Sequence, residues 1–225
     1  MYSPEFRDNV YQQQNDNPPR ITSEHVESAV NWFNQHLPGN VEWKHVLDYG
    51  CGNGDIWWSL LQKWADVDFV EISNKMVELL RKKYVYPWKL SKVLDGKDVM
   101  WESKVFWAES PQNLPVKKES YDYIITWSVF HHIDPNNWKN FLDKFSELLK
   151  IGWRMVITWR DESDVVLQQD WFKWRVTWQP SYSINSLLER VDRERYEVEE
   201  TWVYNEKLAA FNIPRMFRYY VLRRK

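Results

Sequence analysis

A glycine-rich turn that follows an apolar run constrains this chain more than any other feature. Gly50, Gly52 and Gly54 stand at every second position after residues 46–49, and a helix-like pattern follows them. Glycine is needed where the backbone must take a positive φ, or must touch a ligand that a Cβ would block. This order predicts the first strand, turn and helix of a nucleotide-binding α/β unit, with Glu71 ending the second strand.

The glycine spacing argues against a dinucleotide as the ligand. A dinucleotide fingerprint has the form G-x-G-x-x-G, which places a pyrophosphate at the helix N-terminus. Here the third glycine comes one residue early, and Asp55 follows it. A carboxylate at that place would take the free N–H groups itself and repel a phosphate, so a nucleoside without phosphates is expected. Glu71, about twenty residues after the turn, is placed to accept hydrogen bonds from ribose hydroxyls.

Four segments, in order, resemble the motifs of the class I S-adenosylmethionine-dependent methyltransferases, and together they cover residues 40–160. They are the turn motif apolar-Leu-Asp-x-Gly-x-Gly-x-Gly, a third-strand segment, a fourth-strand segment and a helix–turn–strand, at residues 46–54, 104–115, 121–133 and 136–158. The resemblance implies S-adenosylmethionine as cofactor. The cofactor-binding residues that it implies are Tyr11, Asp48, Gly50, Cys51, Gly52, Glu71, Ile72, Ala108, Glu109, Thr126, Trp127 and Ser128.

The resemblance also implies the fold, an α/β Rossmann-like three-layer sandwich. Its sheet is expected to be seven-stranded and mostly parallel, with a closing antiparallel hairpin. The expected strands are 44–49, 67–71, 105–107, 121–126, 154–158, 196–204 and 217–223, and the expected helices are 22–36, 56–63, 75–83, 136–150 and 184–190. We expect a single domain over residues 1–225, with an N-terminal arm or lid and helix (1–40), a cofactor-binding core (41–160) and an acceptor-side segment with the hairpin (161–225).

Composition limits the partners and the compartment. The net charge is −2, so no overall field attracts nucleic acid, and binding of nucleic acid is not expected. The basic residues near the C-terminus alternate with apolar ones and fit the end of a last strand. The single cysteine, Cys51, cannot form an internal disulfide, and its place in the turn favours a packing role. No apolar stretch is long enough to span a membrane, so we expect a cytoplasmic protein.

Two adjacent histidines, His131 and His132, are the catalytic candidates. They follow the fourth strand, at the sheet edge where the sulfonium of the cofactor is expected, and imidazole can remove a proton from an acceptor at neutral pH. The alternative is that they only orient the loop. Their adjacency does not suit a metal site, and we predict no metal.

The acceptor is expected to be a small molecule methylated on oxygen, nitrogen or carbon. The chain has no Asn-Pro-Pro-Tyr motif after the fourth strand, which argues against an amide or exocyclic base nitrogen. Two alternatives stay open: a macromolecular methyltransferase acting on RNA or protein, and a non-catalytic subunit that binds S-adenosylmethionine.

Tryptophan is unusually abundant, with 16 residues against 6 glycines. Several of them stand where proteins with these motifs often carry glycine: Trp43, Trp57, Trp64, Trp107 and Trp153. Trp153 follows Gly152 in a turn, where a positive φ would strain it. The pattern has three interpretations: an altered or engineered sequence, ordinary core filling, or an acceptor pocket lined by aromatic rings that include Tyr11, Phe130 and Trp171.

Overall fold

The structure is a computed structural model. It describes residues 41–52, 54, 65–82, 90–94, 97–101, 104–127, 129–160, 187–208 and 213–225. The predicted helices at 22–36 and 56–63, and the first part of the predicted helix at 184–190, lie outside the described residues.

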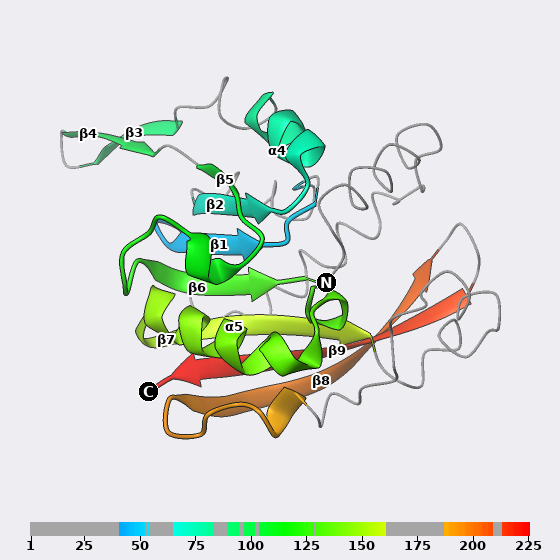
Figure 1. Ribbon diagram of the computed structural model, residues 1–225. Helices are drawn as coiled ribbons and strands as arrows, with labels where there is room; N and C mark the ends of the chain where they lie inside the picture. Colours follow the sequence, from blue (N-terminus) through cyan, green and yellow to red (C-terminus); the bar gives the residue numbers. More distant parts are fainter. Residues whose placement is uncertain are drawn as a thin grey trace.

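Seven strands form one sheet in the order β5-β2-β1-β6-β7-β9-β8 (Figure 1). The strands are β1 (His45–Tyr49), β2 (Asp66–Glu71), β5 (Val105–Trp107), β6 (Tyr121–Thr126), β7 (Leu149–Arg160), β8 (Tyr196–Leu208) and β9 (Ile213–Arg224). The strands from β5 to β7 are parallel, whereas β9 runs antiparallel to both β7 and β8. The predicted mostly parallel sheet with a closing antiparallel hairpin is confirmed.

The sheet is covered on both faces, as the three-layer prediction requires. Neighbouring residues of a strand point to opposite faces, and Val46 and Leu47 accordingly belong to two separate core clusters. The cluster of Val46 includes three residues of α4 (Asn74–Leu80), and the cluster of Leu47 includes Trp138, Phe141, Leu142, Phe145 and Leu148 of α5 (Pro135–Leu148). Ser73 caps α4 by accepting a hydrogen bond from the amide of Met76.

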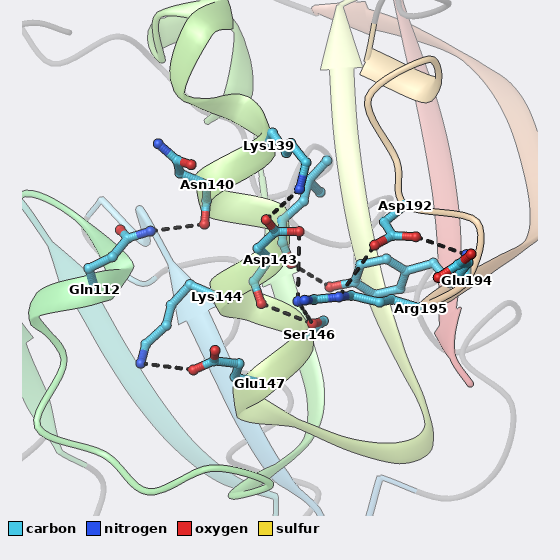
Figure 2. Close-up of polar contacts among 12 residues, drawn as sticks. Gln112, Lys139, Asn140, Asp143, Lys144, Ser146, Glu147, Asp192, Glu194 and Arg195 are labelled. Atoms are coloured by element: carbon cyan, nitrogen blue, oxygen red, sulfur yellow. Dashed lines mark hydrogen bonds and ion pairs between the residues drawn. The ribbon is translucent and has the colours of Figure 1, made fainter.

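Polar contacts fix the outer surface of α5, as Figure 2 shows. Arg195, just before β8, reaches Asp143 Oδ1 at 3.7 Å and Ser146 Oγ at 3.3 Å. On the other side, the Gln112 side chain donates to the carbonyl of Asn140 at 2.9 Å. Gln112 belongs to η2 (Pro111–Asn113), the short helix after β5. These contacts tie α5 to segments on both sides of it.

The sequence-based boundaries differ from the observed ones in several places. β7 begins at Leu149, not at 154, and its pairing with β6 is irregular between Leu149 and Arg154, where Gly152 has a φ of 80°. Trp153 lies within β7 and is not among the described residues with positive φ, so the expectation of strain there is wrong. The described non-glycine residues with positive φ are Trp43, at 66°, and Glu119, at 54°.

A small antiparallel hairpin was not predicted. It consists of β3 (Leu90–Leu94) and β4 (Lys97–Trp101), which pair with each other and not with the main sheet. The signal for it is present in the sequence, because the Asp-Gly dipeptide at 95–96 favours a two-residue hairpin turn. In the described parts of the chain, no helix combines the length and apolar character needed to cross a membrane.

Candidate functional site

The predicted cofactor residues that the structure describes lie at or just after the carboxyl ends of β1, β2, β5 and β6, where the strand order reverses. From β1 the chain adds β2 and β5 on one side, and it then returns to add β6 on the other side of β1 (Figure 1). In open α/β sheets, ligands bind at this switch point, outside the carboxyl ends of the strands. The glycine turn follows β1 there, and the loop with both histidines follows β6.

The glycine turn is shaped by its neighbours on both sides. The amide of Gly50 donates to the carbonyl of Val70 at 2.8 Å, which turns the chain over the end of β2. Gly50 has a φ of 75°, and a Cβ on it would lie 2.4 Å from Cγ2 of Val129 in the loop after β6. Both the conformation and the close approach therefore require glycine at this position.

Glu71 joins the turn to the end of β2. Its buried carboxylate accepts hydrogen bonds from the amides of Gly52 (3.0 Å), Ile72 (2.7 Å) and Ser73 (3.1 Å). From the sequence we predicted a ribose-binding role for Glu71, but not its role in holding the glycine turn. Ionised carboxylate oxygens have room for more than these donors, so the ribose contact stays a prediction.

Asp48, the last but one residue of β1, is the unusual group of the site. Its side chain is 0% exposed, and neither carboxylate oxygen has a hydrogen-bond partner among the described residues. Burial raises the pKa of Asp48 well above its usual range, and the charge of Glu71 raises it further. A buried carboxylate without a partner is costly, and a cationic ligand group would remove that cost.

Burial and the neighbouring acidic residues also set the protonation state of Cys51. Burial raises the pKa of its thiol well above the usual range, and the charges of Asp48 and Glu71 act in the same direction. A thiol that stays protonated is a poor nucleophile. Cys51 is therefore an inert residue of the turn, and the local negative charge fits the cationic sulfonium and ammonium groups of S-adenosylmethionine.

The segment after β5 completes the side of the site formed by β2. The amide of Ala108 donates to the carbonyl of Glu71 at 3.2 Å, and Glu109 follows it with an exposed side chain. Trp107, at the end of β5, donates from its indole N–H to the carbonyl of Ile72 at 2.7 Å and is 41% exposed. Trp107 was not predicted as a site residue, although an aromatic residue at the carboxyl end of a strand is a usable signal.

The loop after β6 is anchored to α5. Both histidines belong to the short helix η3 (Phe130–His132), and His132 is half-buried. The indole N–H of Trp138 donates to the carbonyl of Phe130 (3.2 Å), the first residue of this helix, and to that of Ile133 (3.0 Å), the residue after it. Phe130 itself is fully buried beside Phe141 and Phe145. It therefore belongs to the core, and the idea that it lines an acceptor pocket is wrong.

The remaining predicted residues are placed as follows. Thr126 ends β6 and is fully buried, and its hydroxyl has no hydrogen-bond partner among the described residues. Trp127 follows and packs on the ring of Tyr219 in β9, with centroids 5.6 Å apart. Tyr11, Ser128, Trp57, Trp64 and Trp171 lie outside the described residues.

Comparisons with known proteins agree with this architecture. The family model described as "Methyltransferase domain" matches residues 23–201. Among solved structures, a methyltransferase of Thermotoga maritima described as a possible histamine N-methyltransferase is 18% identical, with TM-score 0.66 and 99% and 97% of the two chains covered. Magnesium protoporphyrin IX methyltransferase of Synechocystis, solved with bound S-adenosylmethionine, is 17% identical, with TM-score 0.59 and 89% and 78% covered.

A third similar structure is a TehB-like methyltransferase of Corynebacterium glutamicum, 14% identical, with TM-score 0.61 and 99% and 98% of the two chains covered. A search of curated protein sequences found no match. The family model spans most of the chain, and the fold, the glycine turn and the buried carboxylates agree with it. The chain therefore belongs to the methyltransferase domain family and is a class I enzyme that uses S-adenosylmethionine as its methyl donor.

Proposed function

We propose that this enzyme methylates a small-molecule acceptor on oxygen, nitrogen or carbon. The descriptions of two similar structures name small acceptors. One is magnesium protoporphyrin IX methyltransferase, and the other is a possible histamine N-methyltransferase. They support this class of acceptor without identifying the compound. The net charge of −2 gives no general attraction for nucleic acid.

The observation that carries the cofactor assignment is Asp48. In our proposal this buried carboxylate faces the cationic amino acid end of the cofactor, beside the backbone of Gly50, Cys51 and Gly52. Glu71 holds the ribose. Ile72, Ala108, Glu109, Thr126, Trp127, Ser128 and Tyr11 complete the proposed cofactor contacts.

The proposed chemistry needs few protein groups. When bound, S-adenosylmethionine supplies a methyl group whose bond to sulfur breaks as an acceptor lone pair attacks, with the bonding electrons left on sulfur. The chain must then position the acceptor and exclude competing water. His132, on its anchored loop, takes the acceptor proton where there is one to lose, and His131 is the second candidate for this role.

Calorimetric titration tests the cofactor site. We expect Glu71→Ala to bind S-adenosylmethionine at least about tenfold more weakly than wild type, since a hydrogen bond to a charged group contributes about 1.5–3 kcal/mol. Because Glu71 also holds the turn, Glu71→Gln serves as the matched variant of similar size, with circular dichroism to check folding. Equal affinities for wild type and Glu71→Ala, or a preference for NAD, would overturn the assignment.

The acceptor class needs a separate experiment. Cell extract incubated with the enzyme and S-adenosylmethionine carrying an isotopically labelled methyl group is separated into small-molecule, RNA and protein fractions. Label in the small-molecule fraction is the expected result. Label confined to RNA or protein would make the enzyme a macromolecular methyltransferase, and cofactor binding without any labelled product would make the chain a non-catalytic subunit.

A further inference from the structure

A histidine and two aspartates meet at the amino ends of β1 and β2, at the other end of these strands from the glycine turn. His45 is the first residue of β1, and the register pairs it with Asp66, the first residue of β2. Nε2 of His45 lies 3.0 Å from Oδ2 of Asp68 and 3.6 Å from Oδ2 of Asp66. One ligand atom from each of the three residues lies within 4.8 Å of the others. This arrangement brings the ligand types of a transition-metal site together.

The backbone determines which nitrogen of His45 faces the aspartates with its lone pair. Nδ1 lies 2.9 Å from the carbonyl oxygen of Ser120. A carbonyl oxygen only accepts, so Nδ1 carries the hydrogen. Nε2 faces two carboxylates and lies within hydrogen-bond distance of Asp68. Burial lowers the pKa of His45, but the hydrogen bond to Asp68 and the charge of Asp66 raise it on balance, so without a metal the positive group of the cluster is the second ring proton. A metal ion would take the place of that proton. Histidines that bind metals have this arrangement, with one nitrogen on the ion and the other donating to a carbonyl.

The carboxylate of Asp68 is held in place from outside the cluster. Its Oδ1 accepts from the amide of Lys104 at 3.0 Å, and its Oδ2 accepts from the hydroxyl of Tyr121 at 2.9 Å. Asp66, by contrast, has an Oδ1 without a hydrogen-bond partner among the described residues. The positive charge of Lys104 also acts on Asp66 and competes with any ion there. One aspartate is thus positioned, and the other has coordinating capacity left.

The distances suit a metal ion at the centre of the cluster. Zinc bonds to nitrogen and oxygen of about 2.0–2.2 Å place the ligands of a tetrahedral site about 3.3–3.5 Å apart. The observed separations of 3.0 and 3.6 Å lie on either side of this range. The side chains of His45, Asp66 and Asp68 are 26%, 22% and 2% exposed, so water can reach the cluster and complete the coordination.

We propose that His45, Asp66 and Asp68 bind a divalent transition-metal ion that joins the amino ends of β1 and β2. Two carboxylates balance the charge of the ion. Where His45 is an imidazolium beforehand, its Nε2 proton passes to solvent as the nitrogen lone pair bonds to the metal. The site lies at the sheet edge away from the cofactor, so its role is structural, and it does not depend on the acceptor or on catalysis.

Zinc titration of the chelator-treated full chain tests the proposal. We expect one Zn²⁺ per chain by calorimetry, and a higher melting temperature with Zn²⁺. His45→Asn keeps a side-chain N–H for the carbonyl of Ser120 but has no Nε2, and Asp66→Asn keeps the side-chain shape without the charge. Each is expected to lower the Zn²⁺ affinity by at least about tenfold. Asp143→Asn, on the surface of α5, is the matched control and should bind like wild type.

Two results would overturn the proposal. One is the absence of saturable binding at millimolar Zn²⁺, which would leave the imidazolium as the cation of the cluster. The other is Zn²⁺ binding that Asp66→Asn retains in full, which would place the ion elsewhere. Asp66 is partly exposed and its Oδ1 accepts no described hydrogen bond, so this variant is expected to fold even if His45→Asn does not.

Discussion

The parallel strands of the sheet have a carboxyl end and an amino end, called here the carboxyl edge and the amino edge. The buried aspartates at these two edges differ in their hydrogen-bond partners. At the carboxyl edge, Asp48 of β1 has no hydrogen-bond partner among the described residues. At the amino edge, Asp68 of β2 is equally buried but accepts from the Lys104 amide and the Tyr121 hydroxyl and pairs with His45. A buried carboxylate with several partners is compatible with stability, whereas one without partners destabilises the fold.

The difference separates a binding edge from a structural edge. The carboxyl edge keeps a buried carboxyl group without hydrogen-bond partners among the described residues next to a glycine turn, as a ligand site does when its own partner comes from outside. The amino edge also carries Trp153, whose ring packs edge-on against Tyr123 at 5.4 Å and lies beneath Lys44 at 4.6 Å. Changes at the first edge should act on binding and turnover, and changes at the second should act on stability.

The largest expected effect is at the carboxyl edge. If His132 is the general base, His132→Ala should lower turnover by about 10²–10⁴-fold and leave the affinity for S-adenosylmethionine nearly unchanged. The measurement is single-turnover transfer of labelled methyl to the acceptor found in the extract experiment, alongside calorimetry with the cofactor. A variant that keeps most of its rate would leave this histidine with an orienting role only.

At the amino edge, the largest expected effect is on stability. Trp153→Gly removes a ring that packs against both core clusters and places a second glycine in β7. We expect a loss of about 2–4 kcal/mol in the free energy of unfolding, because removal of the ring leaves space on the sheet. The loss is not larger because Trp153 is partly exposed. Chemical denaturation measures this loss. A gain in stability would revive the idea that this tryptophan replaced a glycine.

The paired variants Asp48→Asn and Asp68→Asn test the comparison itself. Asp48→Asn removes a buried carboxyl group whose pKa the fold raises, and it should stabilise the ligand-free enzyme by about 1–3 kcal/mol at neutral pH, while weakening cofactor binding. Asp68→Asn disturbs several satisfied contacts and should destabilise it by a similar amount. Melting and calorimetry of both variants give the signs. If both variants shift stability in the same direction, the two edges do not differ as described.

The effect of Asp48 should also depend on pH in a defined direction. The folded state raises the pKa of this carboxyl, so its favourable contribution is complete below the unfolded value of about 3.9 and is lost as pH rises through the folded value. The stability gain of Asp48→Asn over wild type should therefore be near zero at about pH 4 and grow toward neutral pH. A gain that is independent of pH would mean that the pKa of Asp48 is the same in the folded and unfolded states, so that burial does not raise it.

The carboxyl edge was the more predictable of the two from sequence. The glycine turn, the acid at the end of β2 and the strand β6 are local signals, each carried by a few consecutive residues. Residue spacing alone was enough to bring Asp48, Gly50 and Glu71 into one region, because parallel strands end at the same edge.

The amino edge was not predictable, since its contacts join residues far apart in the chain. His45 meets Asp68, Ser120 and Tyr121 only after β6 has returned beside β1. No sequence motif carries that cluster, and the prediction of no metal considered only the adjacent histidines at 131 and 132. Asp48 illustrates the same limit, because its lack of partners is a property of the folded surroundings and not of its own sequence motif.

The smallest expected effect concerns Trp43, which lies two residues before the start of β1 and does take a positive φ, of 66°. A left-handed conformation costs a residue with a Cβ about 1–2 kcal/mol, and glycine avoids this strain. Trp43 is partly exposed, so the loss of its ring contacts offsets part of the gain, and Trp43→Gly should stabilise the enzyme by up to about 1 kcal/mol. Trp43→Ala is the matched control, since it removes the ring but keeps the Cβ and the strain, and it should be less stable than Trp43→Gly in chemical denaturation. If the glycine variant is no more stable than the alanine variant, the positive φ is not a source of strain, and the amino edge tolerates tryptophan there without penalty.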